Sequence, residues 1–290
     1  MSIVEHNFIQ KQEVINRRIA ICYICVSPHD VFLRSLQTLH ESLANSDGVD
    51  KALSIDVFFV FPGCPDQDSV DHAKQTSFAN DRKNSKTHVL EFDKLVREPG
   101  ELAQKAMNEI FETYAFAMIT RNDILFSIHT MILFIFFYIQ FGHNLSRYFA
   151  YGMYLSIVPG IREYKSRTNH ALISPSSTFS GVTWAMSRES NALVPVLPIR
   201  ASWEELEAAI QDVAIQDANY NFMTVGYPHV RYDNNSDPIL RHLVHDIHRY
   251  IQLENPKFGM KRYRLEGGGP ESGKYFGTIS EVVPMKITKL

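Results

Sequence analysis

Apolar residues follow two different patterns along the first half of the chain. Four segments of strand length are mostly apolar or β-branched and end at polar, Gly or Pro residues: 18–26, 53–61, 86–92 and 115–120. Two other segments repeat apolar residues every three or four positions, which is the helical period: 27–48, where Ser27 is the predicted cap, and 101–114. Strands that alternate with helices predict an α/β fold with a mixed, largely parallel sheet and helices on both faces.

The second half of the chain is less regular. Strands are predicted within three segments: 147–160, 178–189 and 221–232. A capped helix is predicted over 202–218, and an amphipathic helix over 235–255 precedes a tail rich in Gly, Lys and Arg. We therefore expect a polar N-terminal arm, one α/β domain, and a C-terminal helix with a basic tail, at residues 1–17, 18–238 and 239–290.

Residues 131–141, with the sequence MILFIFFYIQF, form the most apolar segment. Eleven helical residues cover about half of a bilayer's hydrocarbon core, so the segment is too short to span a membrane. It is apolar on every side, which predicts a helix buried in the protein core. The alternative is a peripheral contact with a membrane surface.

Composition narrows the class of protein. With 290 residues, 45% of them hydrophobic, and a formal charge of −3, the chain can bury a large core and has no broad positive field for binding nucleic acid. Three cysteines make no disulfide framework, and the N-terminus carries charges where a signal peptide is apolar. We expect a cytoplasmic protein, at the inner face of a membrane if it binds one.

Cys22 and Cys25 have the CxxC spacing of a redox or zinc motif. They lie in a predicted strand, however, and residues three apart on a strand point to opposite faces. We therefore predict that both cysteines pack in the core as small apolar side chains.

Polar residues follow the predicted strand 115–120 abruptly, beginning with Thr120 and continuing with Arg121, Asn122 and Asp123. In open parallel α/β sheets, ligands bind outside the carboxyl ends of the strands, where these side chains would lie. A carboxylate there suits Mg²⁺ or Mn²⁺ bridging a diphosphate. The alternative is that Asn122 and Asp123 cap a following helix.

The order of these segments resembles the GT-A fold glycosyltransferases, especially the inverting family two, which uses nucleotide-sugar donors. The resemblance covers residues 18–232 and is carried by IAICYICVSPHDVFLRSLQTL, IDVFFVFPGCPD, REPGELAQKAMNEIFETYAFAMITRNDILF, and TFSGVTWAMSRES followed by WEELEAAIQDVAI. It implies a GT-A-like domain with a nucleotide-binding half (18–126) and an acceptor half (127–238). It also implies an inverting transfer of sugar to a glycan or lipid-linked acceptor in polysaccharide biosynthesis.

The resemblance also suggests donor-binding residues. The family's Asp-x-Asp motif falls on residues 120–123, which leaves Asp123 as the ligand for Mn²⁺ or Mg²⁺. Arg121 could do part of the metal's work by neutralising phosphate. The remaining donor-binding candidates are Asn122, Lys105 in the family's helix, and Ser27 and His29 in the loop after the first strand. Phe61 and Pro62 stand where the family has an acidic residue that holds the base.

The catalytic base implied by the resemblance is Asp212, with Gln211 in place of the family's preceding Glu. A carboxylate at that position would take the proton of the acceptor hydroxyl. The alternative for Asp212 is a solvated position on the helix. The reduced acidic motifs also leave open a second function, a catalytically inactive GT-A-like binding or scaffold protein.

Two further patterns suggest other chemistry. GGPESGKY at 268–275 is close to a phosphate-binding loop but has Tyr275 in place of a small hydroxyl, so a basic tail is the preferred interpretation. HLVHDIH at 242–248 spaces its histidines three apart, which spreads them around a helix and favours solvated side chains over a zinc site. A narrower alternative gives His229 or His242 to the metal at Asp123.

Overall fold

The computed structural model describes the greater part of the first 233 residues and a short pair of strands near the C-terminus. The described residues are 17–82, 84–93, 96–141, 148–153, 173–176, 179, 181–216, 221–225, 230–233, 262–267 and 275–280. The predicted arm at 1–17, apart from residue 17, and the predicted helix at 235–255 lie outside them. His229 and His242 do so as well.

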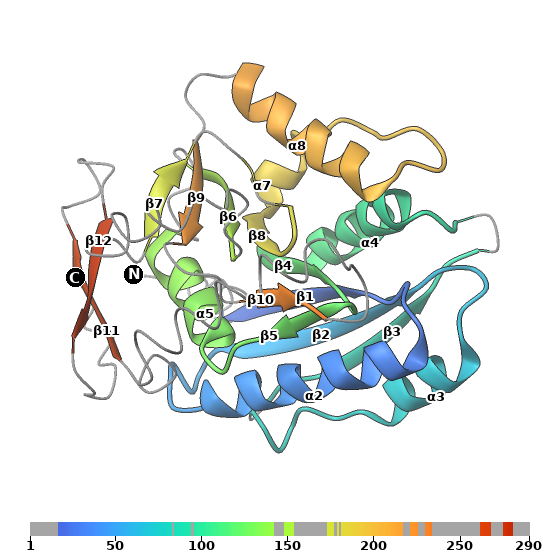
Figure 1. Cartoon of the computed structure of the whole chain (residues 1–290), viewed down its shortest axis with the longest axis horizontal. Helices are drawn as coiled ribbons and strands as arrows, with labels where there is room; N and C mark the ends of the chain where they lie inside the picture. The colour runs from blue at the N-terminus through green and yellow to red at the C-terminus, as the bar shows by residue number, and fades with distance from the viewer. Residues whose placement is uncertain are drawn as a thin grey trace, which may run out of the picture.

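An eight-stranded mixed sheet forms the centre of the structure, in the order β3-β2-β1-β4-β8-β6-β9-β7 (Figure 1). Its first half is parallel and consists of β1 (Arg18–Ile24), β2 (Ser54–Phe61), β3 (Thr87–Glu91) and β4 (Phe116–Arg121). Its second half consists of β6 (Tyr148–Gly152), β7 (Ile173–Ser176), β8 (Trp184–Ser187) and β9 (Asn221–Val225). Strand β8 is antiparallel to both β4 and β6, and β6 is parallel to β9. The four predicted strands of the first half are thereby confirmed.

Helices cover both faces of this sheet (Figure 1). One core cluster joins the sheet to α2 (His29–Asn45), α3 (Gln67–Gln75) and α5 (Thr130–Phe141). The other cluster joins the opposite face to α4 (Pro99–Thr113) and α8 (Trp203–Gln216), and the short α7 (Arg188–Asn191) precedes α8. The predicted α/β arrangement, with a mixed, largely parallel sheet between two layers of helices, is confirmed.

Cys22 lies in β1 and Cys25 directly follows it, and the two side chains lie on opposite faces of the sheet. Cys22 packs in the cluster with α4 and α8, and Cys25 packs in the cluster with α2 and α5. Both are buried free thiols. The prediction that they are core residues is confirmed, because the strand geometry points them apart.

Helix α5 is buried, as its all-round apolar character predicts. Phe134 and Phe137 are fully buried, and Phe136 is 5% exposed. These side chains pack against the sheet and α2, which favours the core-helix prediction over the membrane-surface alternative for this segment. None of the helices in the described part of the chain has the length and apolar character needed to cross a membrane.

Two local predictions are wrong, and one helix was not predicted. Helix α2 begins after Pro28, which makes no side-chain capping bond, so Ser27 is not its cap. Residues 122 and 123 form a turn into the short strand β5 (Ile124–Phe126), which pairs with β10 (Val230–Tyr232), so they do not cap a helix. Helix α3 was not predicted because only Val70 and Ala73 are apolar and buried in it.

The C-terminal segment contains an antiparallel pair of strands, β11 (Arg262–Gly267) and β12 (Tyr275–Ser280). A strand therefore starts at Tyr275, where a phosphate-binding loop would continue into a helix. This agrees with the prediction that 268–275 is not such a loop.

Candidate active site

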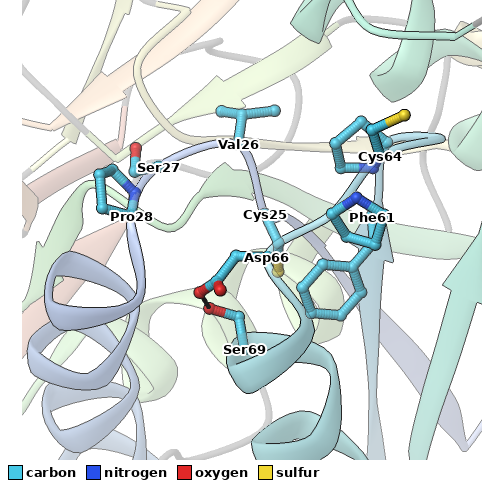
Figure 2. Close-up of a pocket in the computed structure, with 10 residues that line it drawn as sticks. Cys25, Val26, Ser27, Pro28, Phe61, Cys64, Asp66 and Ser69 are labelled. Carbon is cyan, nitrogen blue, oxygen red and sulfur yellow. Dashed lines mark hydrogen bonds between the residues drawn. The ribbon is translucent and has the colours of Figure 1, made fainter.

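The carboxyl ends of β1 and β2 border a pocket of about 200 Å³ (Figure 2). The loop after β1 forms one wall, and the loop after β2 with the start of α3 forms the other. The lining residues are Cys25, Val26, Ser27, Pro28, Phe61, Pro62, Cys64, Pro65, Asp66 and Ser69. The predicted donor-binding residue Ser27 thus borders this pocket, as do Phe61 and Pro62.

Asp66 and Ser69 provide the polar part of the wall. The Ser69 hydroxyl donates to Asp66 Oδ2 at 2.7 Å, and His29 Nδ1 lies 3.0 Å from the same hydroxyl oxygen. His29, another predicted donor-binding residue, also packs edge-on against His72, with ring centroids 5.9 Å apart. Asp66 was missed at the sequence level, although it directly follows the Pro-Gly-Cys-Pro turn that ends β2.

Two helices start at the pocket. Pro28 precedes α2 and Asp66 precedes α3, and both residues line the pocket wall (Figure 2). The N-terminus of a helix carries a partial positive charge and backbone N–H groups without intrahelical partners. Two such ends direct partial positive charge toward the pocket, and the carboxylate of Asp66 in the pocket wall offsets part of it.

Asn122 connects the pocket loop to the end of β4. Its Oδ1 accepts hydrogen bonds from the backbone N–H groups of Val26 and Ser27 at 3.1 and 2.9 Å, and its Nδ2 donates to the Ser27 carbonyl at 3.1 Å. The residue is fully buried. The structure therefore places this predicted donor-binding side chain against the loop, where it fixes the loop's shape.

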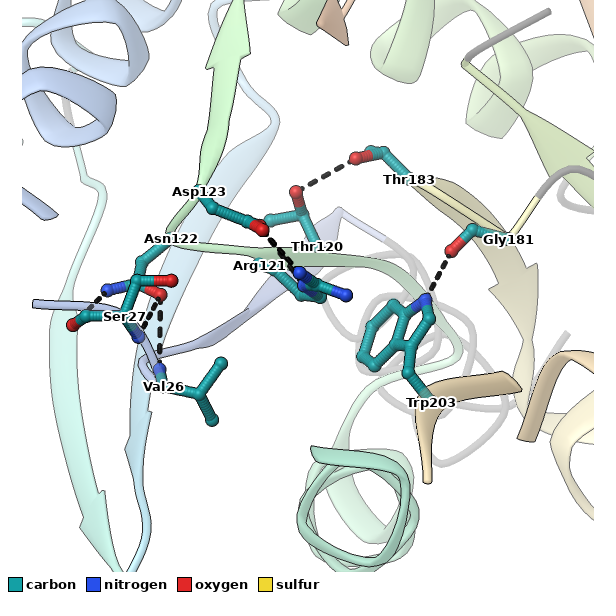
Figure 3. Close-up of polar contacts among 9 residues, drawn as sticks. All are labelled: Val26, Ser27, Thr120, Arg121, Asn122, Asp123, Gly181, Thr183 and Trp203. Atoms are coloured by element: carbon teal, nitrogen blue, oxygen red, sulfur yellow. Dashed lines mark hydrogen bonds and ion pairs between the residues drawn. The ribbon is translucent and has the colours of Figure 1, made fainter. Parts of the chain in front are cut away.

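Arg121 and Asp123 form an ion pair at the end of β4 (Figure 3). Arg121 Nε donates to Asp123 Oδ1 at 3.0 Å, and Nη2 donates to Oδ2, so both carboxylate oxygens are engaged. The guanidinium carbon of Arg121 also lies 5.4 Å from the centre of a Trp203 ring. A carboxylate on one edge and an indole on one face fix the orientation of the guanidinium.

The surroundings of Asp123 do not form a metal-binding cage. Across the described residues, no three His, Cys, Asp or Glu side chains come together in a group suited to hold a metal ion. Mg²⁺ and Mn²⁺ require several oxygen ligands, and both oxygens of Asp123 already contact Arg121. The metal role of Asp123 stays a prediction, and the described residues around it do not fit one.

Helix α8 presents one face to the site. Trp203, Glu207 and Gln211 are four residues apart and therefore lie along one side of the helix. Trp203 Nε1 donates to the Gly181 carbonyl at 2.8 Å, and Gln211 Oε1 accepts from Phe179 N at 2.6 Å (Figure 3 shows the former). A Cβ atom added to Gly181 would lie 2.1 Å from Glu207 Oε1, so the Glu207 carboxyl rests directly on Gly181.

Glu207 has an environment suited to a proton acceptor. Burial raises the pKa of its carboxyl above the ordinary value, and the neighbouring charge of Glu204 raises it further. Trp203 and the positive charge of Arg121 oppose this rise in the pKa. A partly buried carboxyl group near a cation and with a raised pKa is typical of a general base.

The predicted base Asp212 lies elsewhere on α8. It is exposed, while its neighbour Gln211 faces the 179–181 segment. Consecutive helical residues are about 100° apart, so Asp212 does not share the face of Glu207. The signal for Glu207 in the sequence was its spacing of four from Trp203. It was missed because the resemblance assigned the family's Glu-Asp pair to Gln211 and Asp212.

The last predicted donor-binding residue, Lys105, lies on α4. Its ammonium group pairs with Glu101 at 2.8 Å, and Glu101 also accepts from the backbone N–H of Arg200. The structure therefore places Lys105 beside the segment that leads into α8. It does not line the pocket between β1 and β2.

Comparisons with known proteins give likeness in structure alone. No protein-family model matches the chain, and no curated protein sequence does. The solved structure of S. aureus TarS residues 1–349 is 10% identical with a TM-score of 0.46, and covers 83% of this chain and 74% of its own. The same protein in complex with UDP is 11% identical, with a TM-score of 0.45 and coverages of 84% and 74%.

A third solved structure, of a mycobacterial protein, is also 11% identical. Its TM-score is 0.44, and the alignment covers 93% of this chain and 87% of that chain. At these values the likeness concerns the course of the chain, and the assignment of function depends on the site described above.

Proposed function

We propose that the chain is a glycosyltransferase that uses a nucleotide-sugar donor. The observation that carries the proposal is the arrangement of a pocket, a cation and a carboxyl group at the carboxyl ends of the parallel strands. A pocket at the N-termini of two helices lies beside the loop held by Asn122, the cation Arg121 ends the neighbouring strand β4, and the carboxyl of Glu207 is close enough for the charge of Arg121 to influence its pKa. The resemblance of the segment order to GT-A fold enzymes supports the same function.

The donor would lie along this order. The nucleoside would occupy the pocket between the loops after β1 and β2, where Asp66 offers a carboxylate acceptor and Ser27 offers backbone groups. The two helix N-termini and Arg121 would stabilise the diphosphate, whose negative charge grows as it leaves. The sugar would then extend toward Gly181 and Glu207.

In the proposed reaction, an acceptor hydroxyl attacks the anomeric carbon of the sugar. The carboxylate of Glu207 takes the hydroxyl proton, the new carbon–oxygen bond forms, and the bond to the diphosphate breaks with both electrons passing to the leaving phosphate oxygen. A single displacement inverts the anomeric centre. The acceptor we propose is a glycan or lipid-linked hydroxyl, on the resemblance alone.

An inactive GT-A-like binding protein is the second candidate. The ion pair of Asp123 with Arg121 and the exposure of Asp212 favour it, because neither of the two predicted acidic residues offers a free carboxylate in the site. Such a protein would bind nucleotide without transfer, or would bind none.

A panel of UDP-, GDP-, CMP- and dTDP-sugars tests the proposal. We expect one donor to raise the melting temperature and to be hydrolysed slowly without acceptor, with release of the sugar in the inverted configuration by NMR. The Glu207→Gln variant is the matched control, which should bind the donor and hydrolyse it far more slowly. Donor binding without hydrolysis in the wild-type chain would favour the binding protein, and the absence of both would overturn the proposed function.

A further inference from the structure

We infer that Arg121, and not a divalent metal ion, is the cation that holds the donor diphosphate, so that donor binding by this chain is independent of divalent metal. The inference rests on the proposed function and specifies how the donor is held. It follows from how the four polar residues at the end of β4 are already engaged.

The side chains of residues 120–123 are all held by protein partners. Thr120 Oγ1 lies 2.9 Å from Thr183 Oγ1, and Asn122 bonds to the loop after β1 (Figure 3). Asp123 Oδ1 accepts a hydrogen bond from Arg121 Nε, and Oδ2 accepts one from Nη2. The side chains that would coordinate a metal ion therefore already bind other groups of the protein.

A divalent cation at Asp123 would also meet electrostatic repulsion. It would have to approach a carboxylate whose two oxygens already face a guanidinium, and an arginine keeps its charge at every physiological pH. The Asp123 side chain is 4% exposed, so water screens this repulsion weakly. Metal binding at Asp123 would therefore have to compete with the Arg121 ion pair.

Arg121 has the properties that diphosphate binding requires. Its side chain is 21% exposed, so it is reachable from solvent and yet lies in surroundings where charges interact strongly. Asp123 and Trp203 fix its orientation before any ligand binds. Its planar group carries a positive charge and five N–H donors, and it matches phosphate oxygens in pairs.

Calorimetric titration of the full chain with UDP, GDP and dTDP, in EDTA and in MnCl₂, tests the inference. We expect one nucleoside diphosphate to bind with the same affinity in both buffers. Arg121→Gln should weaken this binding by about 10- to 100-fold, the factor that corresponds to a charge-assisted hydrogen bond. Arg121→Lys, which keeps the charge without the planar fork, should lose less. The control is Lys51→Gln, which removes an exposed cation just before β2, at the amino ends of the parallel strands.

The possible failures are distinguishable. Binding that occurs in MnCl₂ and is lost in EDTA would overturn the inference and leave the proposed function standing. Absence of binding in both buffers would overturn both. Asp123→Asn gives an independent measurement. If Asp123 only positions Arg121, nucleotide binding by this variant should be insensitive to Mn²⁺. If binding by the wild-type chain depends on Mn²⁺ and binding by the variant does not, Asp123 would be a metal ligand. The EDTA comparison uses the wild-type chain and does not depend on the folding of any variant.

Discussion

Asn122 and Ser27 exchange hydrogen bonds in both directions. The Ser27 N–H donates to Asn122 Oδ1 at 2.9 Å, and Asn122 Nδ2 donates to the Ser27 carbonyl at 3.1 Å. The side-chain amide thus pairs with the backbone as a neighbouring strand would, beyond the point where β1 and β4 stop pairing. This contact makes the pocket loop and the Arg121 strand end one structural unit.

Asn122→Ala should destabilise the fold and weaken nucleotide binding together. The change leaves the partly buried N–H groups of Val26 and Ser27 and the Ser27 carbonyl without their partner, which costs about 1–3 kcal/mol for each group that water cannot reach. Urea unfolding measures the stability, and calorimetry measures the binding. Asn108→Ala is the control, because Asn108 is exposed and accepts one hydrogen bond from Asn191. Equal effects of the two substitutions would contradict the structural role of Asn122.

Glu207→Gln should reduce transfer by about 10²- to 10⁴-fold, the usual contribution of a positioned proton acceptor. Donor affinity should change little, because the amide keeps the shape of the carboxyl. Asp212→Asn on the same helix is the matched control and should keep nearly full turnover, since Asp212 is exposed. The reverse result, with Asp212→Asn inactive and Glu207→Gln active, would restore Asp212 as the base.

Glu207→Gln should also raise the stability of the protein at neutral pH. Burial raises the pKa of Glu207 in the folded state, so between the unfolded and folded pKa values the folded state holds the extra proton. Stability therefore falls as the pH rises through that window, and the penalty persists at neutral pH in the wild-type chain. Melting temperatures of the two proteins should converge as the pH falls below the unfolded pKa. A pH-independent difference would reject this explanation.

Gly181→Ala should affect activity more than stability. The new Cβ would lie about 2 Å from three atoms of the Glu207 side chain, which is flexible and can move away at small cost. We expect turnover to fall with little change in the urea midpoint, because the displaced group is the proposed base. Gly48→Ala is the control, since its Cβ would meet nothing within 4 Å. Unchanged turnover in Gly181→Ala would remove the requirement for Glu207 in its observed position.

Phe136→Asp should destabilise the protein by about 4 kcal/mol or more, because it buries an unpaired charge in the core. Phe136 is 5% exposed on α5. Ile128→Asp is the control, since Ile128 precedes the same helix and is 39% exposed. Chemical unfolding of the two variants measures the difference, and comparable stabilities would contradict the burial of α5.

The sequence predicted the strands of the main sheet apart from β7 and placed the candidate site at the carboxyl ends of the parallel strands, because long apolar strands and the polar residues that end them are local signals. It predicted α5 as a core helix for the same reason. It did not predict that Arg121 and Asp123 pair with each other, since this depends on the turn into β5. Strand β5 in turn pairs with β10, more than 100 residues later.

The choice of Asp212 over Glu207 shows a different limit. Both residues belong to one predicted helix, and its apolar residues indicate the buried side without showing which of the carboxyl groups beside it lies at the site. The structure decides it through Trp203, whose indole donates to Gly181 and fixes the rotation of α8. Gly181 belongs to the segment 178–189, in which a strand was predicted. The sequence did not show that this segment lies against α8.

The position of Trp203 provides the chain with its own optical reporter. The protein has two tryptophans, and their rings lie 5.1 Å apart at 56°, with Arg121 over one of them. Indole emission from the chain therefore originates from a single place, beside the group proposed to hold the donor. Titrations followed by intrinsic fluorescence should report occupancy of this site without any attached dye.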